Sequence, residues 1–241
     1  YEISTRDWSS DVCSSDLLSN KIFDNKYYQD HVPYRDLHDV VGHAVRMLYL
    51  AAGATDVWLE TGDPSLKQAI DAQWHNLTKK RMYVSGGVGS RWHGESIGDD
   101  YELPNDTAYT ETCAAIASVM WNWRLLQGTG EARYADLLEW TLYNGVMPGL
   151  SLSGNEYFYQ NPLENNGTHR RSPWFGCACC PPNVARLLAQ LGSYVASVDS
   201  DTVWFHTYMQ GTIDTSASGI DAAFEVTTNY PWDGQVRIRV T

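Results

Sequence analysis

Helical periodicity decides the fold class of this chain, and it is clearest in the run Leu37-His-Asp-Val-Val-Gly-His-Ala-Val-Arg-Met-Leu-Tyr-Leu-Ala-Ala-Gly-Ala54. Apolar residues recur there at spacings of three and four, as they do along the buried face of a helix. A second helix is expected from Asp63, its N-cap, through Pro64 in the first turn to about Arg81. The remaining helices are expected at about Thr110–Gln127, Glu131–Tyr143 and Pro181–Val198.

The segments between and after these helices predict loops and strands. Tyr83 to Asn105 is expected to be a loop, and Ser151 to Arg171 a second one with a short strand or hairpin at Glu156–Gln160. Beyond Asp199 apolar and polar residues alternate, which predicts strands at Thr202–Met209, Thr212–Thr215, Ala223–Thr228 and Gln235–Val240. Helix pairs followed by strands predict a mostly α protein, with a partial (α/α)6 toroid and then a β segment.

The first seventeen residues do not fit this pattern. The stretch Ser4 to Leu17 is dense in Ser and Asp, has no helical or strand period and resembles a translated sequencing adapter, so residues 1–17 are expected to be a non-native leader. We expect residues 18–199 to form the partial toroid and residues 200–241 to form the β segment. A closed toroid needs roughly twice as many helices, so the sequence is expected to be a fragment of it.

Composition excludes several functional classes. Among 241 residues, 17 basic and 29 acidic side chains give a net charge of 17 − 29 = −12, so no nucleic-acid partner is expected. No apolar run approaches the roughly 20 residues of a membrane span, and no membrane partner is expected. The 10 Trp, 15 Tyr and 5 Phe residues offer flat faces on which sugar rings stack, although large cores use such residues too.

Cysteines are few but clustered. Cys177, Cys179 and Cys180 lie within four residues, directly before Pro181, and a fourth cysteine is Cys113. Adjacent cysteines and an odd total of five fit a disulfide framework poorly, whereas clustered thiols more often bind metal or react. Reduced thiols also suit the cytoplasm, which is the expected localisation.

Two short segments supply metal-type ligands. On a regular helix the side chains of Glu111 and Cys113 would point to nearly opposite faces, so we expect them at the first turn of a helix. Cys180 precedes a proline and is expected just ahead of a helix. Glu111, Cys113, Cys179 and Cys180 would then form a four-coordinate site suited to zinc, with Cys177 as an alternative ligand. The competing interpretation is that each cysteine is an ordinary buried side chain.

Several motifs occur in an order that resembles the β-L-arabinofuranosidases of glycoside hydrolase family 127, from about Tyr27 to Tyr230. They are Gly42–Leu50, Ser85–Gly89, Gly94-Glu95 with Tyr101–Asn105, Tyr109–Ala115, Leu142–Gly145, Tyr159–Glu164 and Trp174–Asn183. The resemblance implies an (α/α)6 barrel, followed by β-sandwich domains, that hydrolyses terminal β-L-arabinofuranosyl groups with retention. The chain departs from the family pattern in lacking the early barrel helices and in ending inside the first sandwich.

Residue roles follow from the same resemblance. It implies that Cys179 is a zinc-bound nucleophile and that Cys180, Cys113 and Glu111 are the other zinc ligands. Glu95 is the implied acid/base, and His43 falls where the family places a substrate-contacting histidine. On their own, Glu95 would be interpreted as a solvated loop carboxylate and His43 as a hydrogen-bonded core residue.

Two aromatic residues flank the metal segment. Tyr159 and Trp174 are candidates for the floor of the sugar site, with packing of the metal loop as the alternative.

The implied chemistry is physically consistent. Retaining glycosidases usually employ two carboxyl groups, and here a Cys179 thiolate would replace the carboxylate that attacks the anomeric carbon. Glu95 would protonate the departing oxygen and then deprotonate water. Three thiolates and one carboxylate give a zinc site a net charge of 2 − 4 = −2, which favours holding the thiolate over activating water.

Two other functions remain open at this point, and both also take a small-molecule carbohydrate as partner. A toroidal sugar lyase or epimerase would use His and Tyr residues and would need no thiolate. A zinc-stapled carbohydrate-binding module would bind sugar without turnover.

Overall fold

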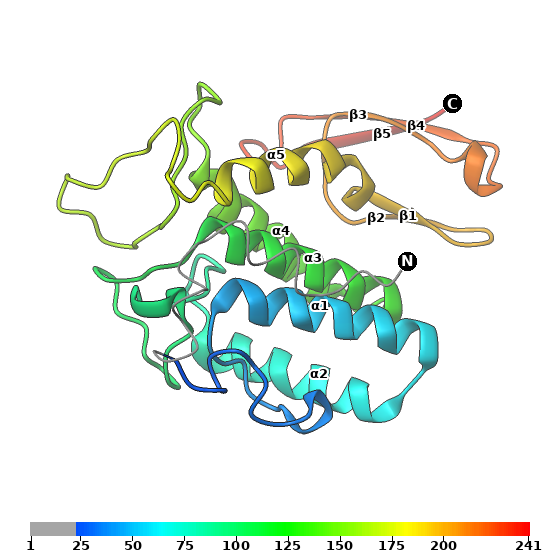
Figure 1. Ribbon diagram of the computed structural model, residues 1–241. Coiled ribbons are helices and arrows are strands. Elements are labelled where there is room, and N and C mark those ends of the chain that lie inside the picture. The colour runs from blue at the N-terminus through cyan, green and yellow to red at the C-terminus, as the bar shows by residue number, and fades with distance from the viewer. Residues whose placement is uncertain (1–22) are drawn as a thin grey trace. The chain divides into compact units, whose positions relative to one another are not determined.

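The computed structural model describes residues 23–241, in two compact units (Figure 1). The first unit ends at Ala185 and the second comprises Arg186–Thr241. The leader expected at residues 1–17 lies outside the described residues. The described chain is mostly helical and has a small antiparallel sheet near its C-terminal end, as the sequence predicts. No helix among the described residues is long and apolar enough to span a membrane.

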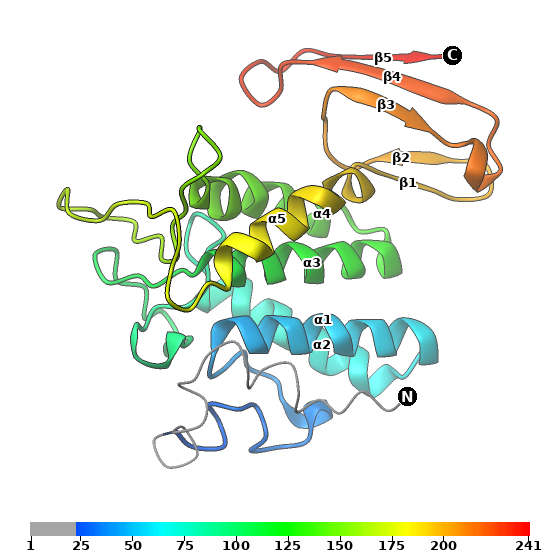
Figure 2. The same cartoon turned by 45° about the horizontal axis from the view of Figure 1, so that its top comes forward.

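Within the described part of the first unit lie four α-helices and the start of a fifth. They are α1 (Ala44–Thr61), α2 (Pro64–Asn76), α3 (Thr112–Thr129), α4 (Ala132–Thr141) and α5 (Cys180–Gln190). Helix α1 packs against α3, while α2 covers α1 and α4 covers α3. Trp121 is fully buried in the core between α1 and α3, and its indole N–H donates to Thr55 Oγ1 at 3.0 Å. The N-terminal ends of α1, α3 and α5 lie at one end of the unit, beside the long loops (Figure 2).

Helix α1 begins later than the sequence predicts. The prediction of helix from Leu37 is wrong, because Gly42 adopts a left-handed φ of 71° and His43 becomes the N-cap. A Cβ at Gly42 would lie 2.3 Å from the carbonyl oxygen of Tyr27, so this close approach requires glycine. The helix runs on past Ala54 to Thr61, where Gly62 closes it in the left-handed conformation.

Helix α2 confirms the predicted cap. Asp63 accepts a hydrogen bond from the backbone N–H of Ser65 at 2.9 Å, and Pro64 is the first helical residue. The helix continues through a π-helical turn at Leu77–Arg81, so its predicted end near Arg81 is confirmed.

The predicted helix from Pro181 to Val198 is too long. Helix α5 ends at Gln190, a tight turn follows at Leu191–Tyr194, and Ala196–Val198 forms strand β1. Gly192 weakens the helix at this point, because glycine loses more conformational freedom than other residues on becoming helical.

The second unit contains two small antiparallel sheets. Strand β1 pairs with β2 (Val203–Phe205), which is shorter than the predicted strand at Thr202–Met209. A three-stranded sheet has the order β3-β4-β5, and its strands span Gly211–Asp214, Ala223–Thr228 and Val236–Val240, close to their predicted bounds.

The short strand or hairpin predicted at Glu156–Gln160, in the first unit, is not a regular strand pair. Tyr157 forms isolated bridges there, to Leu150 and to Ser172.

Candidate metal and catalytic centre

The N-terminal end of α3 positions the first pair of candidate ligands. Glu111 is the N-cap residue, with an extended backbone (φ −59°, ψ 136°), and Cys113 lies in the first turn. Because Glu111 precedes the helix, its side chain and that of Cys113 can point to the same side, as the sequence predicts. Both are buried, with exposed fractions of 1 % and 2 %.

A neighbouring loop clamps this helix start. The Thr112 N–H donates to the carbonyl oxygen of Tyr159 at 3.0 Å, and the Thr112 hydroxyl donates to that of Phe158 at 2.8 Å. The Asn161 side-chain amide donates to the carbonyl oxygen of Thr110, which holds an uncommon φ of 37°. These contacts fix the position of Glu111 and bring Tyr159 beside it.

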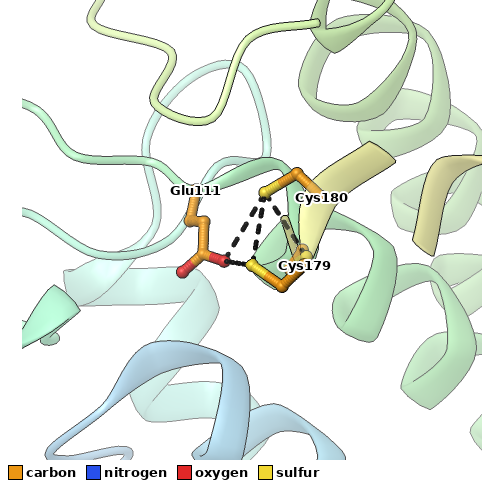
Figure 3. A group of neighbouring side chains, drawn as sticks. Glu111, Cys179 and Cys180 are labelled. Atoms are coloured by element: carbon orange, nitrogen blue, oxygen red, sulfur yellow. Dashed lines mark hydrogen bonds between the residues drawn. The ribbon is translucent and has the colours of Figure 1, made fainter. Parts of the chain in front are cut away.

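The N-terminal end of α5 positions the second pair of candidate ligands, Cys179 and Cys180. Cys180 Sγ lies 3.4 Å from Cys113 Sγ and 3.8 Å from Cys179 Sγ. Glu111 Oε1 lies 3.4 Å from Cys179 Sγ and 3.6 Å from Cys180 Sγ (Figure 3). Glu111, Cys113, Cys179 and Cys180 form a group that could hold a metal ion, and Cys177 is not a member of that group among the described residues.

The spacing of these atoms fits tetrahedral zinc. Ligands at about 2.3 Å for sulfur and about 2.1 Å for carboxylate oxygen stand about 3.8 Å (S to S) and about 3.6 Å (S to O) apart around a tetrahedral ion. The S–S separations of 3.4 and 3.8 Å and the S–O separations of 3.4 and 3.6 Å are close to these values. Glu111 Oε2 is buried and has no hydrogen-bond partner, which also suits a carboxylate that faces a cation.

The ionisable side chains of this ligand group favour the binding of a cation. Hydrogen bonds from Cys113 and Cys180 lower the pKa of Cys179 to about 3, so this residue carries a thiolate. Burial, together with the Cys179 charge, raises the pKa of Glu111 well above its ordinary value. The pKa values of Cys113 and Cys180 are raised as well, by hydrogen bonding to Cys179 and by burial, respectively. One member therefore ionises readily by itself, and a divalent cation would stabilise ionisation of the other three.

Glu95 lies in a sharp turn beside this group. Gly94 and Glu95 both have positive φ angles, 68° and 49°, and the ring of Phe23 leaves no room for a Cβ at Gly94. Glu95 Oε2 is 3.0 Å from His43 Nε2, and the Tyr109 hydroxyl donates to Glu95 Oε1 at 2.6 Å.

The hydrogen bonds of His43 indicate its tautomer. Its Nδ1 accepts from the backbone N–H of Arg46, so Nε2 carries the proton and donates to Glu95. Burial alone would raise the pKa of Glu95, but the hydrogen bonds from His43 and Tyr109 outweigh it and lower that pKa. Glu95 is therefore a carboxylate in the free site.

The structure brings most of the predicted site residues together. Ligand atoms of His43, Glu95 and Glu111 lie within 4.8 Å of one another, so the acid/base candidate borders the metal group. The Tyr159 hydroxyl oxygen is 2.8 Å from Cys179 Sγ. Burial raises the pKa of Tyr159, so the hydroxyl group keeps its proton and donates it in a hydrogen bond to the thiolate. Trp174 instead lies on the surface and is 62 % exposed.

Sequence reasoning missed one residue of this site. Tyr109 contacts Glu95 directly, yet we assigned it no role from the sequence. The available signal was its position two residues before Glu111, within a motif already singled out.

The chain is similar to known glycoside hydrolases. A family profile described as Beta-L-arabinofuranosidase, GH127 catalytic domain, matches residues 5–193. A curated non-reducing end β-L-arabinofuranosidase from Bifidobacterium longum subsp. longum is 41% identical over 228 residues, which cover 89% of this chain and 34% of the relative.

Solved structures give the same result. A GH127 β-arabinofuranosidase matches with a TM-score of 0.85 and 43% identity, over 94% of this chain and 36% of its own. A GH127 β-L-arabinofuranosidase from Geobacillus stearothermophilus T6 matches with a TM-score of 0.85 and 45% identity, over 90% of this chain and 36% of its own. The chain thus spans about a third of the length of these relatives.

Proposed function

This chain belongs to the GH127 β-L-arabinofuranosidase family, and on that premise we propose that it acts as a glycosidase that removes terminal β-L-arabinofuranosyl groups with retention. The main observation that supports this activity is the cluster of four candidate metal ligands beside Glu95, namely Glu111, Cys113, Cys179 and Cys180.

The proposal extends to the architecture. The paired helices α1–α2 and α3–α4 support assignment of residues 18–199 to part of an (α/α)6 toroid. The antiparallel strands within residues 200–241 support the start of a β-sandwich.

Zinc is the proposed metal, held by Glu111, Cys113, Cys179 and Cys180. Three sulfur ligands and one carboxylate suit zinc better than magnesium or calcium, which prefer oxygen. When bound, the ion would neutralise part of the negative charge of these residues and would stabilise their ionised forms.

In the first half of the proposed reaction, the Cys179 thiolate attacks the anomeric carbon and the bond to the departing oxygen breaks. Glu95 donates a proton to that oxygen. Substrate excludes water from the site, which favours the protonated carboxyl over the carboxylate of the free site. Tyr159 donates to the sulfur and holds it in position.

In the second half, Glu95 takes a proton from water, which attacks the same carbon and releases Cys179 as thiolate. The lowered pKa of Glu95 keeps its carboxyl group ionised and able to accept this proton. Two displacements at one carbon restore the original configuration, which is the outcome of a retaining glycosidase. The Nε2–H of His43 stays on Glu95 Oε2 and orients the carboxyl group.

The test is hydrolysis of 4-nitrophenyl β-L-arabinofuranoside by the zinc-loaded protein, with the product anomer followed by NMR. Cys179→Ala and Glu95→Gln are each expected to lower kcat at least ~100-fold, whereas Glu156→Gln, at an exposed loop carboxylate, stays within about threefold of wild type. Wild-type turnover in Cys179→Ala would contradict the assignment of the nucleophile.

The same assay separates the two alternative functions. Sugar binding without turnover would support a non-catalytic module. Elimination or epimerisation products in place of free arabinose would support a lyase or an epimerase.

A further inference from the structure

Tyr109 occupies a fixed position beside Glu95. It is 5 % exposed, and its carbonyl oxygen accepts a hydrogen bond from the Asn161 N–H at 3.1 Å. Its ring lies edge-on to that of Tyr159, with centroids 6.3 Å apart. Backbone and ring are therefore both anchored, and the hydroxyl group has a defined direction.

That hydroxyl reaches the oxygen of Glu95 that His43 does not contact. Tyr109 donates to Oε1 at 2.6 Å, and His43 faces Oε2 at 3.0 Å. Each carboxyl oxygen thus has one donor, and the two contacts together fix the plane of the group. Glu95 needs such anchors, because its side chain is 30% exposed and belongs to a loop.

We propose that Tyr109 is a positioning residue for the reaction, which holds the carboxyl group of Glu95 in the orientation from which it exchanges a proton with the leaving group and with water. This inference rests on the proposed function, since it requires Glu95 to be the acid/base. Tyr109 acts through Glu95 and is not expected to touch the reacting atoms.

A double-mutant cycle tests this role. The variants are Tyr109→Phe, Glu95→Gln and the combination, assayed as zinc-loaded proteins on 4-nitrophenyl β-L-arabinofuranoside. Tyr109→Phe removes only the hydroxyl group and is expected to lower kcat about 10-fold or more, with KM changed less than about threefold. In the Glu95→Gln background the same change is expected to have less than a threefold effect, because residues that act as a unit are non-additive.

Two controls isolate the hydroxyl group. Tyr83 is also buried, at 2 % exposure, and its hydroxyl donates to the carbonyl oxygen of Pro104 rather than to a residue of the candidate site, so Tyr83→Phe is expected to keep wild-type kcat. Zinc content measured in Tyr109→Phe is expected to equal that of wild type, which separates loss of positioning from damage at Glu111.

The outcomes are distinct. Wild-type kcat in Tyr109→Phe, or losses that multiply in the double variant, would overturn the positioning role and leave the proposed function standing. An inactive wild type, or a fully active Glu95→Gln, would overturn the proposed function, and the inference with it.

Discussion

Cys113 Sγ and Cys180 Sγ lie 3.4 Å apart, although the two residues are 67 positions apart in the sequence. Both are buried at the first turn of a helix, and a buried carboxylate and a third sulfur complete the group. Ionised sulfur and carboxylate groups are costly to bury together unless a cation balances their negative charge. The first predictions concern that cation.

Zinc stoichiometry is the simplest consequence. The wild-type protein is expected to retain one zinc ion per chain after dialysis, as measured by inductively coupled plasma mass spectrometry. Cys113→Ser is expected to weaken zinc binding at least ~100-fold, since a hydroxyl group is a poor substitute for a thiolate ligand. Cys177→Ser is expected to retain the metal, and equal loss in both variants would show that Cys177 is a ligand.

Metal removal is expected to lower stability. A ligand that binds only the folded state at 100 times its Kd adds about 2.7 kcal/mol, so a chelator should lower the Tm and added zinc should restore it. Cys180→Ser should no longer respond to zinc. A Tm that is the same with chelator and with zinc would contradict a structural contribution of the metal.

The low pKa of Cys179 predicts an unusual alkylation profile in the zinc-free protein. A pKa lowered to about 3 leaves the thiolate populated throughout pH 5–8, whereas an ordinary thiol loses about tenfold in reactivity per pH unit below about 8. Iodoacetamide labelling at each pH, read by peptide mass spectrometry, should therefore fall only slightly at Cys179. Cys113 and Cys180 should stay protected, because both are buried and hold their protons. A tenfold decrease per pH unit at Cys179 would contradict the thiolate assignment.

Trp121 is a large, fully buried side chain of the core and is expected to contribute strongly to stability. Replacing this fully buried residue by alanine is expected to lower the free energy of unfolding by about 3–5 kcal/mol, because a cavity forms and Thr55 loses its donor. Trp92 is 71 % exposed, so Trp92→Ala should change stability by less than about 0.5 kcal/mol. Denaturant unfolding with equal losses in both variants would contradict this placement of the core.

Local signals in the sequence predicted where the two helices that carry the candidate ligands begin. Prolines after Cys180 and the spacing of Glu111 and Cys113 both pointed to helix starts, and both helices begin there. A helix start is a local property, determined by backbone sterics and by a few neighbouring residues, so one sequence suffices to find it.

Other features depend on tertiary contacts and could not be predicted. The start of α1 moved because Gly42 packs against the carbonyl group of Tyr27, a contact that no local pattern reveals. The role of Tyr109 depends on a loop that brings Glu95 within 2.6 Å of its hydroxyl oxygen. Convergence of α3 and α5 is likewise a property of the whole fold.

Extended X-ray absorption fine structure at the zinc edge tests the central claim most directly. The zinc-loaded protein is expected to show three sulfur ligands at about 2.3 Å and one oxygen at about 2.0–2.2 Å, with one sulfur lost in Cys179→Ala. A shell of nitrogen and oxygen alone, or an unchanged sulfur count in Cys179→Ala, would contradict the proposal that the attacking thiolate is itself a zinc ligand.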